Sequence, residues 1–469
     1  MEPRDDDMTK LPSRSARSIA AEVLHRFRPT RDYAGTLLEP LLDRTTERQR
    51  ATDLVYGTVR NLHAIDVVIE LLSGRPPSRI AKPLLSVLRV AVYELAYNPA
   101  VPDYSIVNEA VKNAGRAGGA KQRGFVNAVL RQILRHIVNR QTDLAEADPR
   151  RTLRQTPQEG CEFDLDILPD PVADLPAHLS TCFSLPAWLV NEWLDALGAD
   201  RVRRVCLACN RRPSLYIRVN RLGTTAEGLL KEFASADIPA ELVPGEPSGP
   251  DMIRVTGPHA VTQLPGFEAG RFVVQDLSAA RIVAAMDPQP GWSILDLCSA
   301  PGTKTTQLAE ITQDAARVLA TDIDHKRLER VQDNIARLGL GSVTVVPYDE
   351  IEQDRRQGFD AILLDVPCSN SGVLARRIEA RFRITSKAVA GLARTQAGLL
   401  EKATALLQPG GRIAYSTCSI QRQENGDVVR RFLADHPAFE LLHEDLLLPE
   451  PEGFDHDGGY IAILHHRRA

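Results

Sequence analysis

The C-terminal part of the chain alternates short apolar runs with segments of helical periodicity, and this alternation is the strongest constraint on its fold. Strand-like runs lie at 293–297, 318–321, 343–346, 359–364 and 412–416. Helical patterns begin at Thr303, at 326 and at 387. Strands separated by helices require right-handed crossovers, which join parallel strands. The pattern therefore predicts an α/β Rossmann-like domain with a parallel sheet over 275–469.

The rest of the chain divides into three further regions. Residues 1–140 are predicted to be an all-α bundle, because apolar residues recur at three- and four-residue spacing between breakers. The acidic, proline-containing segment 141–180 is predicted to be a linker or poorly ordered insertion. Residues 181–274 mix helical and strand patterns, which predicts a small α+β subdomain.

Composition restricts the compartment of the protein. Seven cysteines in 469 residues fit free thiols in a reducing compartment better than a disulfide framework. The start of the chain is charged, without the apolar core of a signal peptide. The apolar stretch 84–97 is interrupted by Arg89 and Glu94, so it does not fit a membrane span. We expect a cytoplasmic monomer that does not enter a membrane.

Two of the cysteines directly follow predicted strands. Cys368 lies in Asp365-Val-Pro-Cys-Ser369, and Cys418 lies in Thr417-Cys-Ser419. The carboxyl ends of the strands line the ligand crevice of an open α/β sheet. The two thiols are therefore predicted to converge on one site and to take part in covalent chemistry.

The turn after the first strand of this domain predicts a nucleoside site. It lacks the G-x-G-x-x-G pattern that binds a dinucleotide pyrophosphate, which disfavours a dehydrogenase. It leads into a helix whose first amides can receive an anion. Asp322 and Asp349 end the next two strands, where Asp322 is placed for ribose hydroxyls and Asp349 for an adenine edge, although either can be a simple helix N-cap. The predicted cofactor is S-adenosylmethionine, and its predicted contacts are Cys298, Ser299, Ala300, Pro301, Gly302, Thr303, Lys304, Asp322, Asp349 and Asp365.

Several motifs in order carry a family resemblance. They are Gln275-Asp-Leu-Ser278, Asp296-Leu-Cys-Ser-Ala-Pro-Gly-Thr-Lys-Thr305, Asp365-Val-Pro-Cys-Ser369, Thr417-Cys-Ser-Ile420 with Glu424-Asn425, and Asp457-Gly-Gly-Tyr460. From about residue 185 onward the chain resembles the Sun-type RNA cytosine carbon-5 methyltransferases. The N-terminal helical region resembles the NusB-like RNA-binding domain. This layout is similar to that of bacterial small-subunit (16S) rRNA methyltransferases and covers nearly the whole chain.

The resemblance implies roles for four catalytic residues. Cys418 is the implied nucleophile toward ring carbon 6 of cytosine, and Cys368 assists the release step. Asp365 is implied to bond the ring nitrogen and exocyclic amine, and Lys304 to meet the carbonyl oxygen of the base or to lower a thiol pKa. DNA cytosine methyltransferases attack with the cysteine of a Pro-Cys motif, so Cys368 stays open as the alternative nucleophile.

The sequence departs from the family in the cofactor turn. Ser299 and Thr303 stand where relatives usually carry Ala and Gly. Because a threonine reaches positive φ only with strain, we expect weaker cofactor binding from Thr303.

RNA contacts are predicted on two basic segments, which the net charge of −4 conceals. One follows the Pro-Cys motif, and the other is the stretch Lys112–Arg140, which has no acidic residue. The basic residues of the first are Arg376, Arg377, Arg381, Arg383 and Lys387, and those of the second are Lys112, Arg116, Lys121, Arg123, Arg131, Arg135 and Arg140. A solvated helix face is the plainer interpretation of either. Because carbon 5 is reached only on an unstacked base, we expect a single-stranded or extruded cytosine.

Other interpretations are weaker. A non-catalytic RNA-binding assembly or antitermination factor is the main alternative, and retention of both thiols and Asp365 disfavours it. An amino-group methyltransferase would carry an Asn-Pro-Pro-Tyr-like motif where Asp365-Val-Pro-Cys stands. Cys206 and Cys209 have zinc-like spacing without a second ligand pair, so no metal site is predicted. The side chains of Cys161, Cys182 and Cys298 are expected to be buried and apolar, with the backbone of Cys298 lining the cofactor site.

Overall fold

The computed structural model describes residues 14–245, 249–257, 259–354 and 358–468. The charged start that argued against a signal peptide therefore lies mostly outside the described residues. The chain divides into two compact units, one of 1–211 with 381–383 and one of 212–380 with 384–469. Each unit is described separately below.

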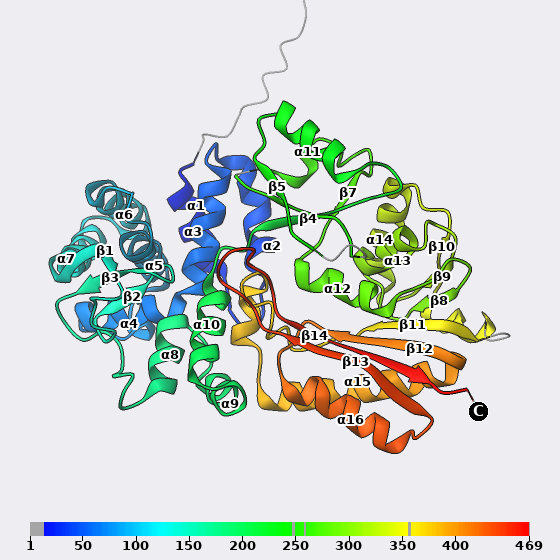
Figure 1. Ribbon diagram of the computed structural model, residues 1–469. Helices are drawn as coiled ribbons and strands as arrows, with labels where there is room; N and C mark the ends of the chain where they lie inside the picture. The colour runs from blue at the N-terminus through cyan, green and yellow to red at the C-terminus, as the bar shows by residue number, and fades with distance from the viewer. Residues whose placement is uncertain (1–13, 246–248, 258, 355–357, 469) are drawn as a thin grey trace, which may run out of the picture. The chain divides into compact units, whose positions relative to one another are not determined.

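The first unit is mainly helical, as predicted (Figure 1). Its helices bury apolar residues that recur at helical spacing, such as Ile65, Leu88 and Val126. Its α-helices are α1 (Ala16–Arg26), α2 (Ala34–Leu38), α3 (Arg48–Arg60), α4 (Leu62–Ser73), α5 (Lys82–Tyr97), α6 (Asp103–Gly118), α7 (Ala120–His136), α8 (Leu175–Phe183), α9 (Ala187–Leu197) and α10 (Ala199–Asn210). Its 3-10 helices are η1 (Glu39–Arg44) and η2 (Pro77–Arg79). Local signals set several boundaries: the hydroxyl of Ser15 caps α1 by accepting from Ser18 N, and α4 ends at Gly74, whose φ is 66°.

The segment predicted to be an acidic linker is folded. β1 (Ile137–Asp143), β2 (Thr152–Arg154) and β3 (Glu159–Phe163) form an antiparallel sheet in the order β1-β3-β2. Leu153 and Cys161 are fully buried in this sheet. The linker prediction was wrong because β1 is polar and partly exposed, so it shows no apolar alternation.

The second unit begins with a small antiparallel sheet of order β5-β6-β4-β7. Its elements are β4 (Leu215–Val219), α11 (Ala226–Ser235), β5 (Ala240–Leu242), β6 (Met252–Val255), η3 (Val261–Gln263) and β7 (Phe272–Val274). Leu229 and Phe233 of α11 pack with Ile217 and Ile253 of this sheet. The predicted α+β region therefore exists, but α9 and α10, which we expected within it, belong to the first unit.

The predicted Rossmann-like sheet follows, in the order β10-β9-β8-β11-β12-β14-β13. Its strands are β8 (Ser293–Asp296), β9 (Arg317–Ala320), β10 (Val343–Val345), β11 (Phe359–Asp365), β12 (Leu407–Thr417), β13 (Phe439–Leu447) and β14 (Gly459–His466). The predicted strands pair in parallel, whereas β14 runs antiparallel to both β12 and β13. The sheet is therefore mixed rather than wholly parallel.

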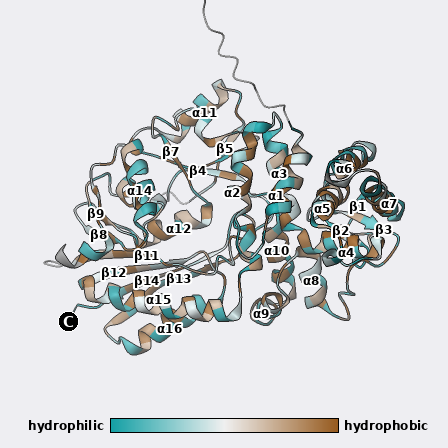
Figure 2. Ribbon diagram, turned by 180° about the vertical axis from the view of Figure 1, so that it is seen from behind, coloured by the Kyte–Doolittle hydropathy of each residue, from teal (hydrophilic) through white to brown (hydrophobic). Residues whose placement is uncertain are grey.

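Helices cover both faces of this sheet, as Figure 1 shows. They are α12 (Leu277–Met286), α13 (Thr303–Ile311) and α14 (His325–Leu338) on one face, and α15 (Ser386–Leu406) and α16 (Gly426–Asp435) on the other. The 3-10 helices of this part are η4 (Tyr348–Asp354), η5 (Ile378–Phe382) and η6 (Arg422–Glu424). Strand β11 is largely apolar (Figure 2), and Ile362 and Leu364 of β11 and Ile413 and Tyr415 of β12 are fully buried. No helix among the described residues is long and apolar enough to cross a bilayer.

Candidate active site

The two thiols lie at the ends of adjacent parallel strands. β11 and β12 pair in register up to Asp365 and Ser416, so the loops that follow them leave the sheet side by side. The structure brings Cys368 Sγ to 3.1 Å from Cys418 Sγ. Cys418 Sγ also lies 3.3 Å from Asn370 Oδ1. The hydrogen bond with the Cys418 thiol and burial raise the pKa of Cys368 well above its ordinary value. The two thiols therefore form one hydrogen-bonded pair.

An ion pair stands beside the thiols. Lys304, the second residue of α13, places Nζ 2.5 Å from Asp365 Oδ1 at the end of β11. Ser416 Oγ donates to the same carboxylate oxygen at 2.8 Å. The pair joins the cofactor turn to the strand that carries the Pro-Cys motif.

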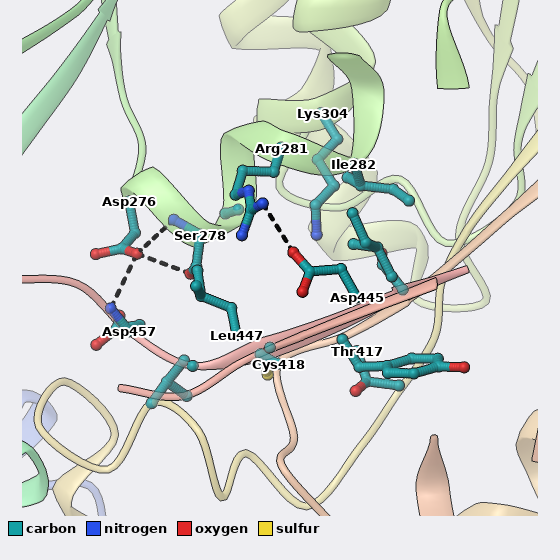
Figure 3. A pocket seen from close by; sticks show the side chains of 17 residues that line it. Asp276, Ser278, Arg281, Ile282, Lys304, Thr417, Cys418, Asp445, Leu447 and Asp457 are labelled. Carbon is teal, nitrogen blue, oxygen red and sulfur yellow. Dashed lines mark hydrogen bonds and ion pairs between the residues drawn. The ribbon is translucent and has the colours of Figure 1, made fainter. Parts of the chain in front are cut away.

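A cavity extends from Lys304 to Cys418, and Figure 3 shows it from close by. Lys304 enters from α13 on one side, and Thr417 and Cys418 lie on the strand end opposite. The cavity is completed by Asp276, Arg281, Asp445, Asp457 and Tyr460. Arg281 and Asp445 pair at 2.7 Å across it. Cys418 lines this cavity, which makes its thiol accessible to a substrate.

The predicted cofactor turn is tightly closed. Gly302 N donates to Ser299 O at 2.6 Å, and Gly302 has a φ of 98° just before α13. A Cβ at Gly302 would lie 3.2 Å from Val331 Cα, so both backbone conformation and space favour glycine there. Thr303 opens α13 and is not among the residues with positive φ. The expectation of strain at Thr303 was therefore wrong, because Gly302 takes the left-handed conformation.

A second cavity, of about 340 Å³, lies along this turn. Its size is within the usual range for small-ligand sites. It is lined by Tyr216, Val274, Gln275, Asp276, Ala279, Asp296, Cys298, Ser299, Ala300, Pro301, Thr303, Lys304, Asp365, Arg376 and Arg377. Most of the predicted cofactor residues thus share one cavity. Burial raises the pKa of Cys298, which fits its interpretation as an apolar side chain whose backbone lines the site.

Two polar atoms in this cavity are buried without a hydrogen-bond partner among the described residues. They are Oδ1 of Asp296 and Oγ of Ser299. The other oxygen of Asp296 accepts from Thr305 Oγ1 at 2.7 Å. Burial raises the pKa of Asp296 to about 7. Because unpaired buried polar atoms are costly, these two indicate a polar or cationic ligand at this place.

The structure leaves Asp322 and Asp349 outside this cavity. Asp322 is nearly buried, and its carboxylate accepts from Ala300 N at 3.2 Å and from Asp324 N at 3.0 Å. It therefore supports the turn itself. Asp349 is exposed on η4. Their ribose and adenine contacts remain predictions.

Most arginines of the basic segment after the Pro-Cys motif donate hydrogen bonds to acceptors within the protein. Arg376 donates to Asp457 Oδ2 at 2.7 Å and to Asp276 Oδ2 at 3.0 Å. Arg381 is 1% exposed and donates to carbonyl oxygens of the first unit, and Arg383 donates to Pro29 O and Asp32 O. The prediction of a phosphate contact was wrong for Arg381, because internal acceptors occupy its buried guanidinium group, and it stays a prediction for the partly exposed Arg376 and Arg383. Arg377 and Lys387 are exposed.

The N-terminal basic segment is mostly exposed. Its exception is Arg140, which donates to the carbonyl oxygens of Leu95, Glu94 and Asn98 at 2.8–2.9 Å and so caps the end of α5. Lys112 and Arg116 line a groove on α6 together with Tyr104, which is 77% exposed. The sequence did not predict Tyr104 as part of this surface.

The structure also locates the remaining cysteines and two aspartates of the cavities. Cys161, Cys182, Cys206 and Cys209 are buried. No group of three or more His, Cys, Asp or Glu side chains that fits a metal ion occurs in the described part of the chain. Asp276 and Asp296 line the cavities but were not predicted site residues, although both belong to the motifs quoted above.

Comparisons with known proteins place this geometry in a class. Residues 283–466 match the family "16S rRNA methyltransferase RsmB/F", residues 185–262 match its ferredoxin-like domain, and residues 14–135 match the NusB family. Among solved structures, PH0851 has a TM-score of 0.71 at 24% identity and covers 96% of this chain and 99% of its own. NSun6 from Pyrococcus horikoshii, solved with SFG, has a TM-score of 0.53 at 20% identity and covers 61% of this chain and 99% of its own. The fold and the matches define a methyltransferase.

Curated relatives define the family further. The chain is 32% identical over 429 residues to "Ribosomal RNA small subunit methyltransferase B" of Salmonella paratyphi A, covering 90% of both chains. It is 29% identical to the "Probable ribosomal RNA small subunit methyltransferase B" of Bacillus subtilis, covering 96% of both. The chain belongs to the RsmB/F family of 16S rRNA methyltransferases. The resemblance seen in the motifs is thereby confirmed.

Proposed function

We propose that this protein methylates carbon 5 of a cytosine in 16S rRNA, with S-adenosylmethionine as methyl donor and a covalent adduct at Cys418. The observation that carries the proposal is the 3.1 Å approach of the two thiols beside the Lys304–Asp365 pair. Two thiols at adjacent strand ends suit a reaction that needs both addition and elimination at one ring.

The 340 Å³ cavity fits the proposed cofactor. The free oxygen of Asp296 and the hydroxyl of Ser299 offer an anionic and a polar contact there, and the turn 298–303 supplies backbone. The solved NSun6 structure contains SFG, an analogue of S-adenosylmethionine, which supports this assignment. When bound, the cofactor supplies an electrophilic methyl group.

The residues of the chain supply the remaining chemistry. The Cys418 thiolate adds to ring carbon 6, so that an S–C6 bond forms and carbon 5 becomes electron-rich. Asp365, oriented by Ser416 and Lys304, holds the ring nitrogen and amine. After methylation, a base takes the proton from carbon 5, the C5–H electron pair forms the C5–C6 double bond, and the electrons of the broken S–C6 bond leave with Cys418. Cys368 assists this release.

Access to the cavity supports the choice of Cys418 as nucleophile. Cys418 lines the cavity that contains Lys304, whereas Cys368 is not among the residues that line it. The Pro-Cys alternative is therefore the weaker one.

Methyl transfer to rRNA that lacks the modification tests this proposal. Labelled S-adenosylmethionine should yield 5-methylcytosine in 16S rRNA with the native protein. Cys418→Ala should abolish both product and covalent adduct, whereas Cys368→Ala should retain or accumulate adduct on denaturing gels. Cys182→Ala, a buried cysteine of the first unit, is the matched control and should keep both. An adduct in the Cys418 variant would contradict the assignment, and label in tRNA alone would overturn the substrate.

A further inference from the structure

Glu424 links the two thiol loops without touching either thiol. It ends η6 and is fully buried. Its Oε1 accepts from Ser369 N at 2.8 Å, and its Oε2 accepts from Ser369 Oγ at 2.5 Å and Ser419 Oγ at 2.6 Å. Ser369 and Ser419 directly follow Cys368 and Cys418 in the chain. One carboxylate therefore binds the residue after each thiol.

The surroundings of Glu424 hold this carboxylate in place. Tyr415, a fully buried residue of β12, donates its hydroxyl to Glu424 O at 2.6 Å. Gln396 of α15, also fully buried, reaches Oε1 at 3.4 Å. A buried carboxylate costs several kcal/mol unless hydrogen bonds satisfy it. Because moving the Glu424 carboxylate would break these bonds, its donors hold it in one position.

Parallel pairing alone does not set the distance between the thiols. The in-register partners of β11 and β12 end at Asp365 and Ser416, before either cysteine. Beyond that point Gly372 N donates to Cys418 O at 3.0 Å, and the Glu424 carboxylate bridges the serines. The charge of Glu424 also contributes to raising the pKa of Cys368.

We propose that Glu424 is a positioning residue that sets the separation of Cys368 and Cys418 through Ser369 and Ser419. This inference rests on the proposed covalent mechanism and names a further residue that the mechanism requires. Misplacement of reacting groups by about 1 Å costs roughly 100-fold in rate. Glu424→Ala should therefore lower kcat about 100-fold, with KM for the methyl donor and RNA affinity nearly unchanged. Glu424→Gln keeps the volume and part of the hydrogen bonding, so it should recover part of kcat.

A thiol-coupling experiment reads the geometry without any methyl transfer. Diamide oxidises the full-length protein, and mass spectrometry follows formation of the Cys368–Cys418 disulfide. The native protein should couple these thiols rapidly because they lie 3.1 Å apart. Glu424→Ala should slow the coupling about tenfold or more, as expected when a tether that preorganises two groups is removed. Thr404→Ala removes a hydroxyl bonded to Leu400 O on α15 and serves as the control.

Ser419→Ala gives a milder second variant should Glu424→Ala fail to fold. It removes the contacts of Ser419 Oγ with Glu424, Ser369 and Ser371 and leaves the buried carboxylate bound to Ser369, so it should slow coupling and kcat in the same direction. Unchanged coupling and unchanged kcat in folded Glu424 or Ser419 variants would overturn the inference. If the native protein methylates no RNA, the proposed function fails, whereas the coupling result still decides whether Glu424 sets the thiol separation.

Discussion

A buried arginine of the small sheet is expected to stabilise the helix that carries Lys304. Arg218 on β4 is 1% exposed, and its guanidinium binds both oxygens of Glu310 on α13 at 2.8 Å each. It also binds Thr306 Oγ1 and Thr303 O at 3.0 Å, together with Gln275. The side chain of Glu310 is 5% exposed, so loss of the arginine leaves a buried carboxylate without its counter-ion.

Arg218→Met should therefore destabilise the protein by about 3–5 kcal/mol. A domain of this size loses about 2–4 °C of Tm per kcal/mol, which predicts a fall of roughly 6–20 °C. Calorimetry or urea unfolding measures the change. The double variant Arg218→Met with Glu310→Met should recover most of the loss, because a buried pair replaced by apolar side chains is often nearly neutral.

Arg221→Met is the matched control, since Arg221 pairs with Asp251 in the same region but is about half exposed. It should cost roughly 0–1 kcal/mol. A loss below about 1 kcal/mol for Arg218→Met, or a double variant no better than the single one, would refute the reasoning, because both require an unpaired buried charge.

Two further predictions concern pH and salt. Burial raises the pKa of Asp296 from 3.8 to about 7, so the folded protein binds a proton there that the unfolded chain has lost. This group therefore lowers stability as pH rises from about 4 to 7, and Asp296→Asn should remove that part of the decline in unfolding curves measured across this range; an unchanged slope would contradict the raised pKa. Lys112→Ala with Arg116→Ala should weaken RNA binding and reduce the slope of log K against log salt by about 1.4, if each contacts one phosphate of a single strand. Lys82→Ala, an exposed lysine outside the α6 groove, should leave the slope unchanged in the same filter-binding titration, and equal slopes in all variants would remove this groove as an RNA surface.

The apolar runs of the large sheet were predicted well, although β14, which is also apolar and mostly buried, was missed. The five apolar runs between 293 and 416 all became strands of the large sheet, within a few residues at most boundaries. β13 was not predicted, because most of its positions are exposed and its pattern is mixed. β1, which begins just before the segment predicted to be a linker, was missed for the same reason. Apolar periodicity detects burial, and polar edge strands leave little trace of it.

The candidate site shows the same division. The order of the motifs predicted one site for both thiols, Lys304 and Asp365. Whether a charged side chain faces solvent was not predictable, because Arg140, Arg376 and Arg381 bind carbonyls or carboxylates from distant parts of the sequence. The sequence shows which side chains are charged, but it does not show which groups they bind.

By itself, the sequence determined the chemistry available to this protein: two cysteines after strands, a glycine turn before a helix, and a lysine at that helix start. The tertiary structure decided the distances. The register of β11 with β12 and the bridge from Glu424 bring Sγ of Cys368 within 3.1 Å of Sγ of Cys418. Residue type fixes which bonds a side chain can make, whereas the distance between residues 50 positions apart depends on strand register and buried hydrogen bonds.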